Sequence, residues 1–522
     1  MKHLRFFNTT GPCHPDEHYM LPPEDRLVGA QLHRYISDKL YWVLHAPRQT
    51  GKTTFLQSWM REINNANQGI ACYVSVERCQ GFSDVSTGMP LIAEAIRTYS
   101  ERSGLPVPDI PNTSPGSMVD AILGNWAKMV APQSLIVFFD EVDVLEGETM
   151  ISFLRQLRSG FAERGTGKFP VSIVLVGMRD LKDYITTSKK GIPVNPGSPF
   201  NIKMDSVILS NFSKDDIVHL FAQRTSENGQ QIEPEALDYV YEQSSGQPWI
   251  VNSLFMRATM RILDSDSTET VTLNHVIEAR EQMIQARETH LDALGERLKD
   301  PRIRRVIEPV LTGEFNPNLG RTNSDVMLAM DLGLVQWTSE TGLTISNPIY
   351  SEILTRHLNS GYHDIMPSPG SWQWQKPDGG MDMDKLLKEF QKFWRRHAEK
   401  WEEKAEYTEA FPHLLLLAFL QRVINGGGAI DRDCGAGRGR MDLFIHFKGE
   451  SFIIEIKMLR EHDSPKTIEE EGLEQVQRYR DKFDAQTPVY LIIFDRRAET
   501  KLKTWCERIF WKKEGGISVL GC

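Results

Sequence analysis

Short apolar runs, each bounded by polar turns, recur along the N-terminal third of this chain of 522 residues. Four of them are almost continuously apolar, a pattern typical of strands that are buried on both faces of a parallel sheet. These runs span residues 40–44, 71–76, 134–139 and 171–176. The stretch after the first run, and the one between the third and fourth, favour helices. The pattern therefore predicts an α/β domain built on a parallel sheet.

Beyond this region the pattern becomes helical. Residues 211–290 favour helices, with an N-cap signal at 211–216 and an interruption at 245–249 where a further helix begins. Residues 300–358 follow a rhythm of helices and a hairpin, which would form the wing of a winged helix. We expect a core domain over residues 1–210, a helical lid over 211–295 and a winged-helix module over 296–358.

A compositional change separates the last part of the chain. Residues 359–384 are rich in glycine and proline, which predicts a linker. A charged helix and an apolar helix follow, and then come two strand-like runs, 439–447 and 451–457. A short glycine turn joins these runs, so they predict a β-hairpin within a C-terminal α/β domain over residues 385–522.

Composition narrows the class of protein. Hydrophobic residues make up 40% and charged residues 25%, as in ordinary soluble globular chains. The net charge of −10 argues against a surface uniformly coated for nucleic acid, although it leaves room for a local basic groove. The 6 cysteines form no C-x-x-C pair, so neither a zinc knuckle nor a disulfide framework is indicated. The longest apolar run, 414–420, is too short to span a bilayer, and we expect a cytoplasmic protein without membrane contact.

A phosphate-binding loop is indicated after the first strand. Main-chain N–H groups of such a loop wrap the β-phosphate of a nucleotide, where the positive end of the following helix dipole favours an anion. Lys52 would reach the β- and γ-phosphates, and Thr53 would ligate Mg²⁺. The first glycine of the pattern is replaced by Ala46, which a turn with negative φ tolerates. The expected nucleotide-binding residues are Ala46, Pro47, Arg48, Gln49, Thr50, Gly51, Lys52, Thr53 and Thr54.

Two carboxylates end the third strand, at the edge of the sheet where open α/β folds bind ligands. Asp140 would hold Mg²⁺ through water, and Glu141 would polarise the attacking water. After the fourth strand, Arg179 is the expected sensor of the γ-phosphate. Arginines on or beyond the intervening helix could serve a neighbouring subunit as an arginine finger, or simply form a solvated helix face; they are Arg155, Arg158 and Arg164.

A second group of candidate residues lies on the C-terminal hairpin. Side chains alternate along a strand, so Glu455 and Lys457 share a face, and Asp442 on the partner strand can converge on them. Carboxylates beside a lysine suit an oxygen-ligated Mg²⁺ next to a cation that orients or activates water and stabilises developing charge. In a helical stretch downstream, Gln475 and Tyr479 lie on one face at i and i+4.

These motifs resemble two families. Residues 20–358 resemble the AAA+-like ATPases, in particular their STAND and archaeal-type branches, on the phosphate-binding loop, the paired carboxylates, the 177–180 segment and the glycine and proline of 246–248. In STAND proteins this proline contacts the nucleotide base, a role that would fall to Pro248. The nucleotide implied by this resemblance is ATP with Mg²⁺.

Residues 400–500 resemble the PD-(D/E)xK nuclease superfamily, near its RecB-like branch, on Gly-Arg-x-Asp, Glu-x-Lys and Gln-x-x-x-Tyr in that order. The resemblance implies a small mixed sheet flanked by helices. It also implies Mg²⁺ or Mn²⁺ at Asp442, Glu455 and Ile456. The acid of the family's first helix would be Glu409, with His413 one turn later, although either could be an ordinary helix-start residue.

Together these interpretations predict an ATP-regulated, Mg²⁺-dependent nuclease that favours DNA over RNA and forms a homo-oligomer whose assembly can depend on ATP. Such fusions make sense in defence against foreign DNA or in mobile elements, an inference by association only. The alternative is a nucleotide-switched scaffold whose C-terminal domain binds nucleic acid or a partner without cutting it.

Overall fold

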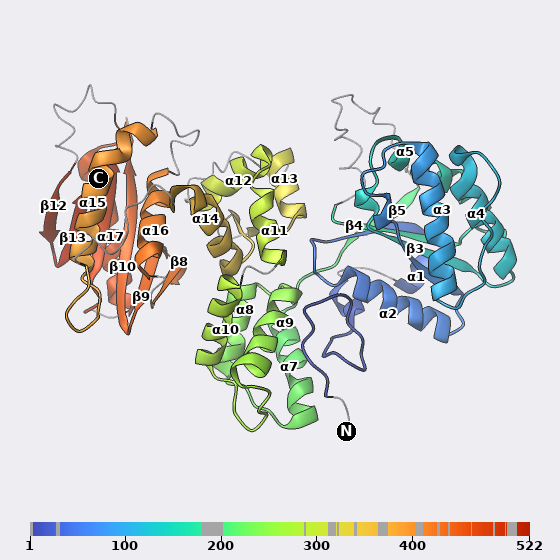
Figure 1. Cartoon of the computed structure of the whole chain (residues 1–522), viewed down its shortest axis with the longest axis horizontal. Helices are drawn as coiled ribbons and strands as arrows, with labels where there is room; N and C mark the ends of the chain where they lie inside the picture. Colours follow the sequence, from blue (N-terminus) through green and yellow to red (C-terminus); the bar gives the residue numbers. More distant parts are fainter. Residues whose placement is uncertain are drawn as a thin grey trace. The chain divides into compact units, whose positions relative to one another are not determined.

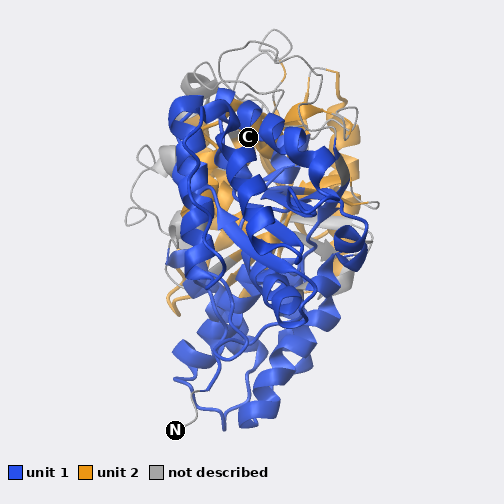
Figure 2. Cartoon of the chain, turned by 90° about the vertical axis from the view of Figure 1, so that its right-hand side faces the viewer, with its two compact units in different colours: residues 1–287, 327–335 blue, residues 288–326, 336–522 orange. Residues whose placement is uncertain are grey.

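The computed structural model of the chain (Figure 1) falls into two compact units, coloured separately in Figure 2. One unit comprises residues 1–287 and 327–335, and the other comprises 288–326 and 336–522. The residues that the structure describes are 4–27, 32–179, 202–286, 289–311, 320, 323–338, 342–363, 374–402, 411–424, 428–436, 439–460, 462–483, 486–495, 497 and 509–522.

The first unit is built on a five-stranded parallel sheet in the order β2-β3-β4-β1-β5. The four strands expected from the apolar runs are all present. The fifth, at one edge, was not predicted. The strands are β1 (Tyr41–His45), β2 (Ile70–Ser75), β3 (Leu135–Asp140), β4 (Ser172–Gly177) and β5 (Lys203–Ile208).

Helices cover both faces of this sheet, as Figure 1 shows for α2 and α3. Alternate residues of each strand enter two separate cores. In β3, Val137 and Phe139 pack with α3, α4 and α5, whereas Ile136 and Phe138 pack with α1 and α2. Burial on both faces explains why these strands read as continuous apolar runs. The helices are α1 (Leu32–Ser37), α2 (Lys52–Asn65), α3 (Val85–Arg102), α4 (Pro115–Val130) and α5 (Gly147–Gly160), with the short 3₁₀ turns η1 (Pro23–Arg26), η2 (Glu77–Cys79), η3 (Val142–Val144) and η4 (Phe161–Glu163).

The predicted lid is helical. Ser213 caps its first helix in a capping box with Asp216, which confirms the N-cap signal. The interruption before α9 needs a glycine, because Gly246 has a φ of +71° and an added Cβ would lie 1.8 Å from the Phe212 carbonyl oxygen. The elements are α7 (Lys214–Asn228), α8 (Pro234–Ser244), α9 (Pro248–Met256), the π-helix η5 (Arg257–Ile262) and α10 (Leu273–Gln285).

Residues 300–358 form helices and a two-stranded hairpin, as their sequence pattern predicts. A two-stranded sheet of β6 (Val335–Thr338) and β7 (Gly342–Ile345) follows the helices. Residues 327–335, which include the end of α13 and the turn after it, group with the first compact unit. The helices of this region are α11 (Thr289–Arg297), α12 (Pro301–Leu311), α13 (Ser324–Asp331) and α14 (Pro348–His363).

The C-terminal region of the second unit has a six-stranded mixed sheet in the order β12-β13-β11-β10-β9-β8. The predicted hairpin is β9 and β10, which pair antiparallel, whereas β10 and β11 run parallel. Helices α15 and α16 pack on one face, and α17 packs on the other. The elements are α15 (Met383–Glu402), α16 (Phe411–Ile424), β8 (Gly428–Ala436), β9 (Gly439–Phe447), β10 (Glu450–Leu459), α17 (Pro465–Phe483), β11 (Val489–Asp495), β12 (Trp511–Glu514) and β13 (Ile517–Gly521).

The described part of the expected linker is ordered against this domain. Gln375 and Met381 form an isolated bridge around a turn, and both the Lys376 ammonium and the main-chain N–H of Met381 donate to the carboxylate of Glu450 at the start of β10. Met381 is fully buried. The glycine and proline content predicts a linker over residues 359–384. The long-range contacts of residues 375–381, however, hold this part of it beside the sheet. The division of the chain into five parts stays a prediction.

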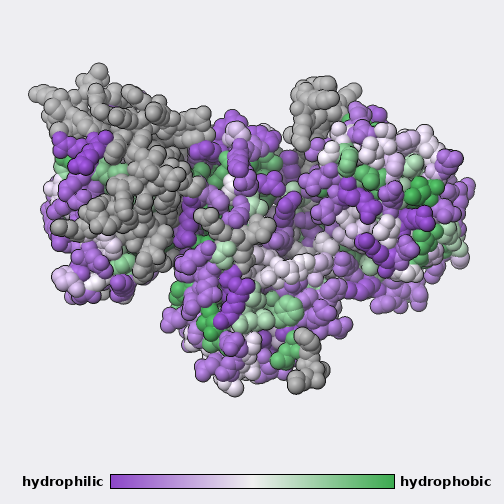
Figure 3. All heavy atoms as spheres, in the orientation of Figure 1, coloured by the Kyte–Doolittle hydropathy of each residue, from purple (hydrophilic) through white to green (hydrophobic). Residues whose placement is uncertain are grey.

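The surface seen in Figure 3 is mostly polar, with apolar side chains scattered over it. Among the helices of the described residues, none combines the length and the apolar character that crossing a bilayer requires.

Candidate functional sites

The loop between β1 and α2 has the geometry of a phosphate cradle. Positive φ angles fall on Gln49 (59°) and on Gly51 (94°), the residue that caps α2. Ala46 has no positive φ, and its N–H donates to the carbonyl of Gly177 on neighbouring β4 at 3.3 Å. The replacement of the first glycine by alanine is therefore accommodated. The N-terminus of a 14-residue helix adjoins this loop and favours an anion there.

Lys52, Thr53 and Asp140 lie beside this loop. The Lys52 ammonium donates to the main-chain oxygens of Ala46 at 2.7 Å and Pro47 at 2.8 Å. Burial lowers the pKa of Lys52, and the negative charge of Asp140 opposes that change. Thr53 Oγ1 donates to Asp140 Oδ2 at 2.8 Å. A hydroxyl and a carboxylate so placed fit the oxygen ligands that Mg²⁺ prefers, so these residues can hold Mg²⁺ beside a nucleotide.

Glu141 follows directly, in a left-handed conformation with a φ of 61°. Its carboxylate Oε2 accepts a hydrogen bond from Ser75 Oγ at the end of β2, at 2.8 Å. Burial raises the pKa of Glu141, and the Ser75 hydrogen bond partly offsets that rise. A carboxylate with a raised pKa at this edge of the sheet suits a general base. Sequence reasoning missed Ser75, because nothing in its local sequence distinguishes it from an ordinary strand-end serine.

The N-terminal segment contacts the phosphate-binding loop. Buried Arg26 donates to the Thr50 carbonyl at 2.6 Å, and burial lowers its pKa to about 10. The Cys13 N–H donates to Thr54 Oγ1 at 3.1 Å. Chain that precedes the sheet therefore holds the loop at two points.

The start of α9, in the region predicted to be a lid, also contacts this loop. Pro248 is the buried first residue of α9. The preceding Gln247 donates through Nε2 to the loop carbonyl of Gln49 at 3.4 Å, so α9 starts beside the loop. A contact between Pro248 and a nucleotide base stays a prediction.

Arg179, the expected phosphate sensor, lies two residues beyond β4 and is paired across the first unit. Its Nε is 3.0 Å from Asp331 Oδ2 at the end of α13, with side-chain exposures of 14% and 19%. The turn after α13 also touches the phosphate-binding loop, because a Cβ added at Gly333 would lie 2.6 Å from the Cβ of Pro47. Asp331 and Gly333, which group with the first compact unit, therefore contact the sensor candidate and the loop.

The three candidate finger arginines differ in their surroundings. Arg164 is held by its own subunit, since its Nε donates to the Lys39 carbonyl at 2.8 Å and its guanidinium lies 3.7 Å from the centre of the Phe161 ring. Arg155 and Arg158 are exposed on α5. Of the three, the latter two present their charge to solvent.

The second candidate site lies between β10 and α17. Lys457 Nζ is 3.0 Å from Glu455 Oε1 and donates to Gln475 Oε1 at 2.7 Å. Gln475 Nε2 donates in turn to the Tyr479 hydroxyl at 2.7 Å. The Glu455 side chain is 1% exposed. The structure therefore brings four of the predicted residues together.

A metal ligand set can be assembled around this cluster. The buried Glu455 carboxylate beside Lys457 fits one oxygen ligand of a divalent metal. Asp442 lies on β9 one position before Leu443, which pairs with Ile454, so the backbone of Asp442 adjoins that of Glu455. The Asp442 side chain lies outside the described residues.

The other predicted residues of this site are placed less completely. Ile456, with an apolar side chain, can offer a metal only its main-chain carbonyl. His413 is half-buried on α16. Glu409 lies outside the described residues.

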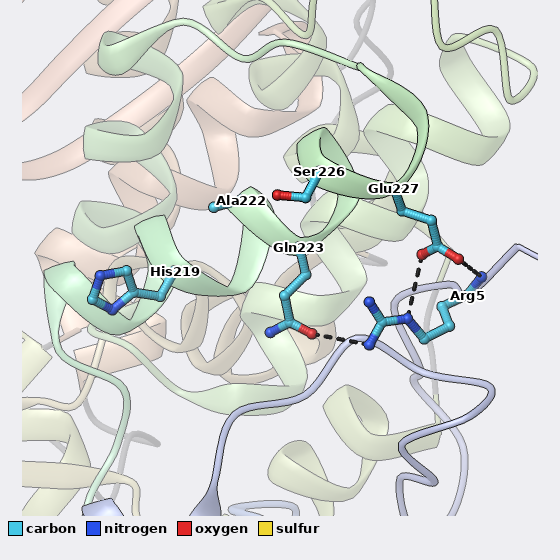
Figure 4. Close-up of a pocket in the computed structure, with 6 residues that line it drawn as sticks. All are labelled: Arg5, His219, Ala222, Gln223, Ser226 and Glu227. Carbon is cyan, nitrogen blue, oxygen red and sulfur yellow. Dashed lines mark hydrogen bonds and ion pairs between the residues drawn. The ribbon is translucent and has the colours of Figure 1, made fainter.

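A separate open pocket of about 370 Å³ lies between the N-terminal segment and α7 (Figure 4). Arg5 spans it, with Nε 3.3 Å from Glu227 Oε2 and Nη1 3.3 Å from Gln223 Oε1. None of the residues that line this pocket belongs to either predicted site.

Comparison with known proteins gives a family match over the segment that contains the second candidate site. Residues 407–501 match a family described as the PD-(D/E)XK nuclease superfamily, and this segment contains β9, β10 and α17. The curated proteins include no match to the chain. The fold class predicted from the sequence is confirmed as α/β: a five-stranded parallel sheet flanked by helices, followed by a C-terminal α/β domain that contains the PD-(D/E)XK match.

Solved structures similar to this chain align with its N-terminal part and share little sequence with it. The Walker-type ATPase PABY2304 of Pyrococcus abyssi is 13% identical over 67% of this chain and 99% of that chain, with a TM-score of 0.47. The ORC2 protein of Aeropyrum pernix is 16% identical over 63% and 91%, with a TM-score of 0.38. The RuvB Holliday junction branch migration motor of Thermotoga maritima is 14% identical over 63% and 96%, with a TM-score of 0.33.

Proposed function

We propose that this chain is an ATP-regulated, Mg²⁺-dependent nuclease that cleaves phosphodiester bonds, with DNA as the preferred substrate. The observation that carries the proposal is the cluster of Glu455, Lys457 and the hydrogen-bonded pair on α17 inside a segment that matches the nuclease superfamily. The phosphate-binding loop with Asp140 and Glu141 supplies the nucleotide-dependent part of the proposal.

At the nuclease site, a bound divalent metal would supply Lewis-acid chemistry and a nucleophilic water. Glu455 and Asp442, with the main-chain oxygen of Ile456, would hold that metal. Lys457 carries a positive charge that can stabilise the charge developing on the phosphate. Gln475 accepts a hydrogen bond from Lys457 and donates one to Tyr479, so it fixes the direction of the lysine.

At the nucleotide site, the loop N–H groups and Lys52 would bind the phosphates of ATP, and Thr53 and Asp140 would hold Mg²⁺. Glu141 would accept a proton from the attacking water. The Ser75 hydroxyl donates to the Glu141 carboxylate, and this hydrogen bond lowers the pKa of Glu141.

The test of the proposed function is a cleavage assay with the full chain on single- and double-stranded DNA and RNA. Reactions contain Mg²⁺, Mn²⁺ or EDTA, each with ATP, ADP or a slowly hydrolysed ATP analogue. We expect cutting that requires the metal, favours DNA and changes with the nucleotide. If the chain bound nucleic acid but cut it under none of these conditions, the nucleotide-switched scaffold would be favoured instead.

We expect Ser75→Ala to move the acidic limb of the ATPase pH profile to higher pH. Burial already raises the pKa of Glu141, and removal of the Ser75 hydrogen bond takes away a contribution that lowers it. The base therefore becomes protonated at a higher pH as the solution is acidified. The dependence of kcat/KM on pH measures this shift. A limb that stays in place or moves to lower pH would contradict the role of Ser75.

Regulation by ATP would act through the ion pair between Arg179 and Asp331. The γ-phosphate of ATP and the Asp331 carboxylate would compete for the same guanidinium, so ATP would loosen the contact of the winged-helix segment with the loop. Nucleotide-dependent assembly is a further part of the proposal, with Arg155 and Arg158 as the exposed finger candidates. Such a restrained nuclease suits defence against foreign DNA or mobile-element biology.

We expect Asp331→Asn to strengthen binding of ATP relative to ADP by about fivefold or more, the lower end of typical allosteric couplings. The matched control is Asp325→Asn on the same helix, since the ion-pair partner of Asp325 is Arg305, at 3.3 Å. Titration with fluorescent nucleotides gives both affinities, and solution mass measurements with the same nucleotides report assembly. If the ratio of ATP affinity to ADP affinity were the same in wild type and Asp331→Asn, Asp331 would have no part in the regulation.

A further inference from the structure

Tyr73 on β2 reaches the Mg²⁺-binding candidate Asp140 on the neighbouring strand. The Tyr73 hydroxyl donates to Asp140 Oδ2 at 3.1 Å, and Thr53 Oγ1 donates to the same oxygen at 2.8 Å. The other oxygen, Oδ1, accepts the Glu141 N–H at 2.9 Å. Three donors from three parts of the fold therefore fix both oxygens of this carboxylate.

These hydrogen bonds matter because Asp140 is only 2% exposed. A buried carboxylate can draw little compensation from bulk water, so each lost donor weakens its solvation directly. A phenol hydroxyl is protonated at neutral pH, so Tyr73 can donate to the Asp140 carboxylate.

The ring of Tyr73 is braced from the other side. Tyr99 of α3 packs edge-on against it, with ring centres 5.5 Å apart and an interplanar angle of 77°. In β2, Ser75 lies two residues on and binds Glu141, so β2 offers one hydroxyl to each carboxylate. The strand spacing of two residues places both hydroxyls on one face.

We propose that Tyr73 is a positioning residue of the Mg²⁺·nucleotide site, acting by holding the Asp140 carboxylate toward Thr53. The inference rests on the proposed nucleotide-binding function and adds a residue that the phosphate-binding motifs do not contain. Without the phenol hydroxyl, Asp140 Oδ2 keeps one donor of two, so the direction of the carboxylate is fixed less firmly. Residues that orient a metal ligand typically change metal affinity or activity 10- to 100-fold when they are removed.

The experiment compares full-length wild type with Tyr73→Phe, which keeps the ring and removes only the hydroxyl. A fluorescent ATP analogue is titrated in EDTA and at increasing Mg²⁺, and Mn²⁺ binding is followed by electron paramagnetic resonance with a slowly hydrolysed analogue. We expect affinity in EDTA within about twofold of wild type and a half-saturating Mg²⁺ concentration raised about 10-fold or more. ATPase turnover should recover at high Mg²⁺.

Tyr99→Phe is the matched control. It removes a phenol hydroxyl from the neighbouring ring, for which the described residues provide no hydrogen bond, and we expect its Mg²⁺ dependence to equal that of wild type. An unchanged Mg²⁺ requirement in Tyr73→Phe would overturn the role of Tyr73 alone. A wild-type protein that binds no nucleotide would overturn both this inference and the proposed nucleotide site.

Discussion

Replacing Lys457 with alanine is expected to reduce phosphodiester cleavage about 10²-fold or more while the divalent metal stays bound. The lysine ammonium lies 3.0 Å from the Glu455 carboxylate but is itself no metal ligand, so its loss should act mainly on the transition state. Single-turnover cleavage rates and calorimetric metal titrations on the same preparation separate the two effects.

Comparison with other variants of the same domain sharpens this expectation. Asp442→Ala should lose both metal binding and cutting, because it removes a proposed ligand. Lys466→Ala is the matched control, since Lys466 is an 85% exposed lysine on α17 whose ion-pair partner is Glu470, one helical turn away. It should cut like wild type. Gln475 and Tyr479 position Lys457 and should give smaller defects. Cleavage undiminished in Asp442→Ala would mean that the motif match is accidental, and the scaffold would then be the better interpretation.

The sequence could predict the elements whose signal is local. The strand Leu135–Asp140 is buried at every position, so its apolar run is unbroken up to the carboxylates that end it. The hairpin of β9 and β10 was visible for a similar reason, because a short glycine turn joins two runs of strand-forming residues. In both cases the fold and the candidate residues follow from neighbours in the chain.

What could not be predicted depends on contacts between distant segments. The edge strand Lys203–Ile208 mixes charged and apolar residues, and its end residue Ile208 is 56% exposed, so no apolar run marks it. The pairing of Arg179 with Asp331 and the hydrogen bonds of Tyr73 and Ser75 join residues far apart in the chain. Residue type and spacing suggest which carboxylates are candidates for catalysis, but only the packing of β2 beside β3 reveals the hydroxyls that bind them.

The nucleotide site yields the second large effect: Glu141→Gln is expected to keep ATP binding and to lose turnover by about 10²- to 10⁴-fold, the range of a general base. Glutamine keeps the size of the side chain and can still accept the Ser75 hydrogen bond, so only the proton acceptor is lost. Lys52→Ala should instead abolish binding, because it removes the ammonium beside the phosphate-binding loop, which is held at 2.7 Å from the Ala46 carbonyl.

Phosphate release and fluorescent-nucleotide titration, measured on both variants, distinguish loss of the base from loss of the binding site. Glu101→Gln is the matched control for the charge change, since Glu101 is exposed near the end of α3 and the variant should hydrolyse ATP like wild type. If Glu141→Gln turned over ATP as fast as wild type, another group would have to accept the proton of the attacking water, and the raised pKa of Glu141 would reflect only its burial and the neighbouring carboxylates.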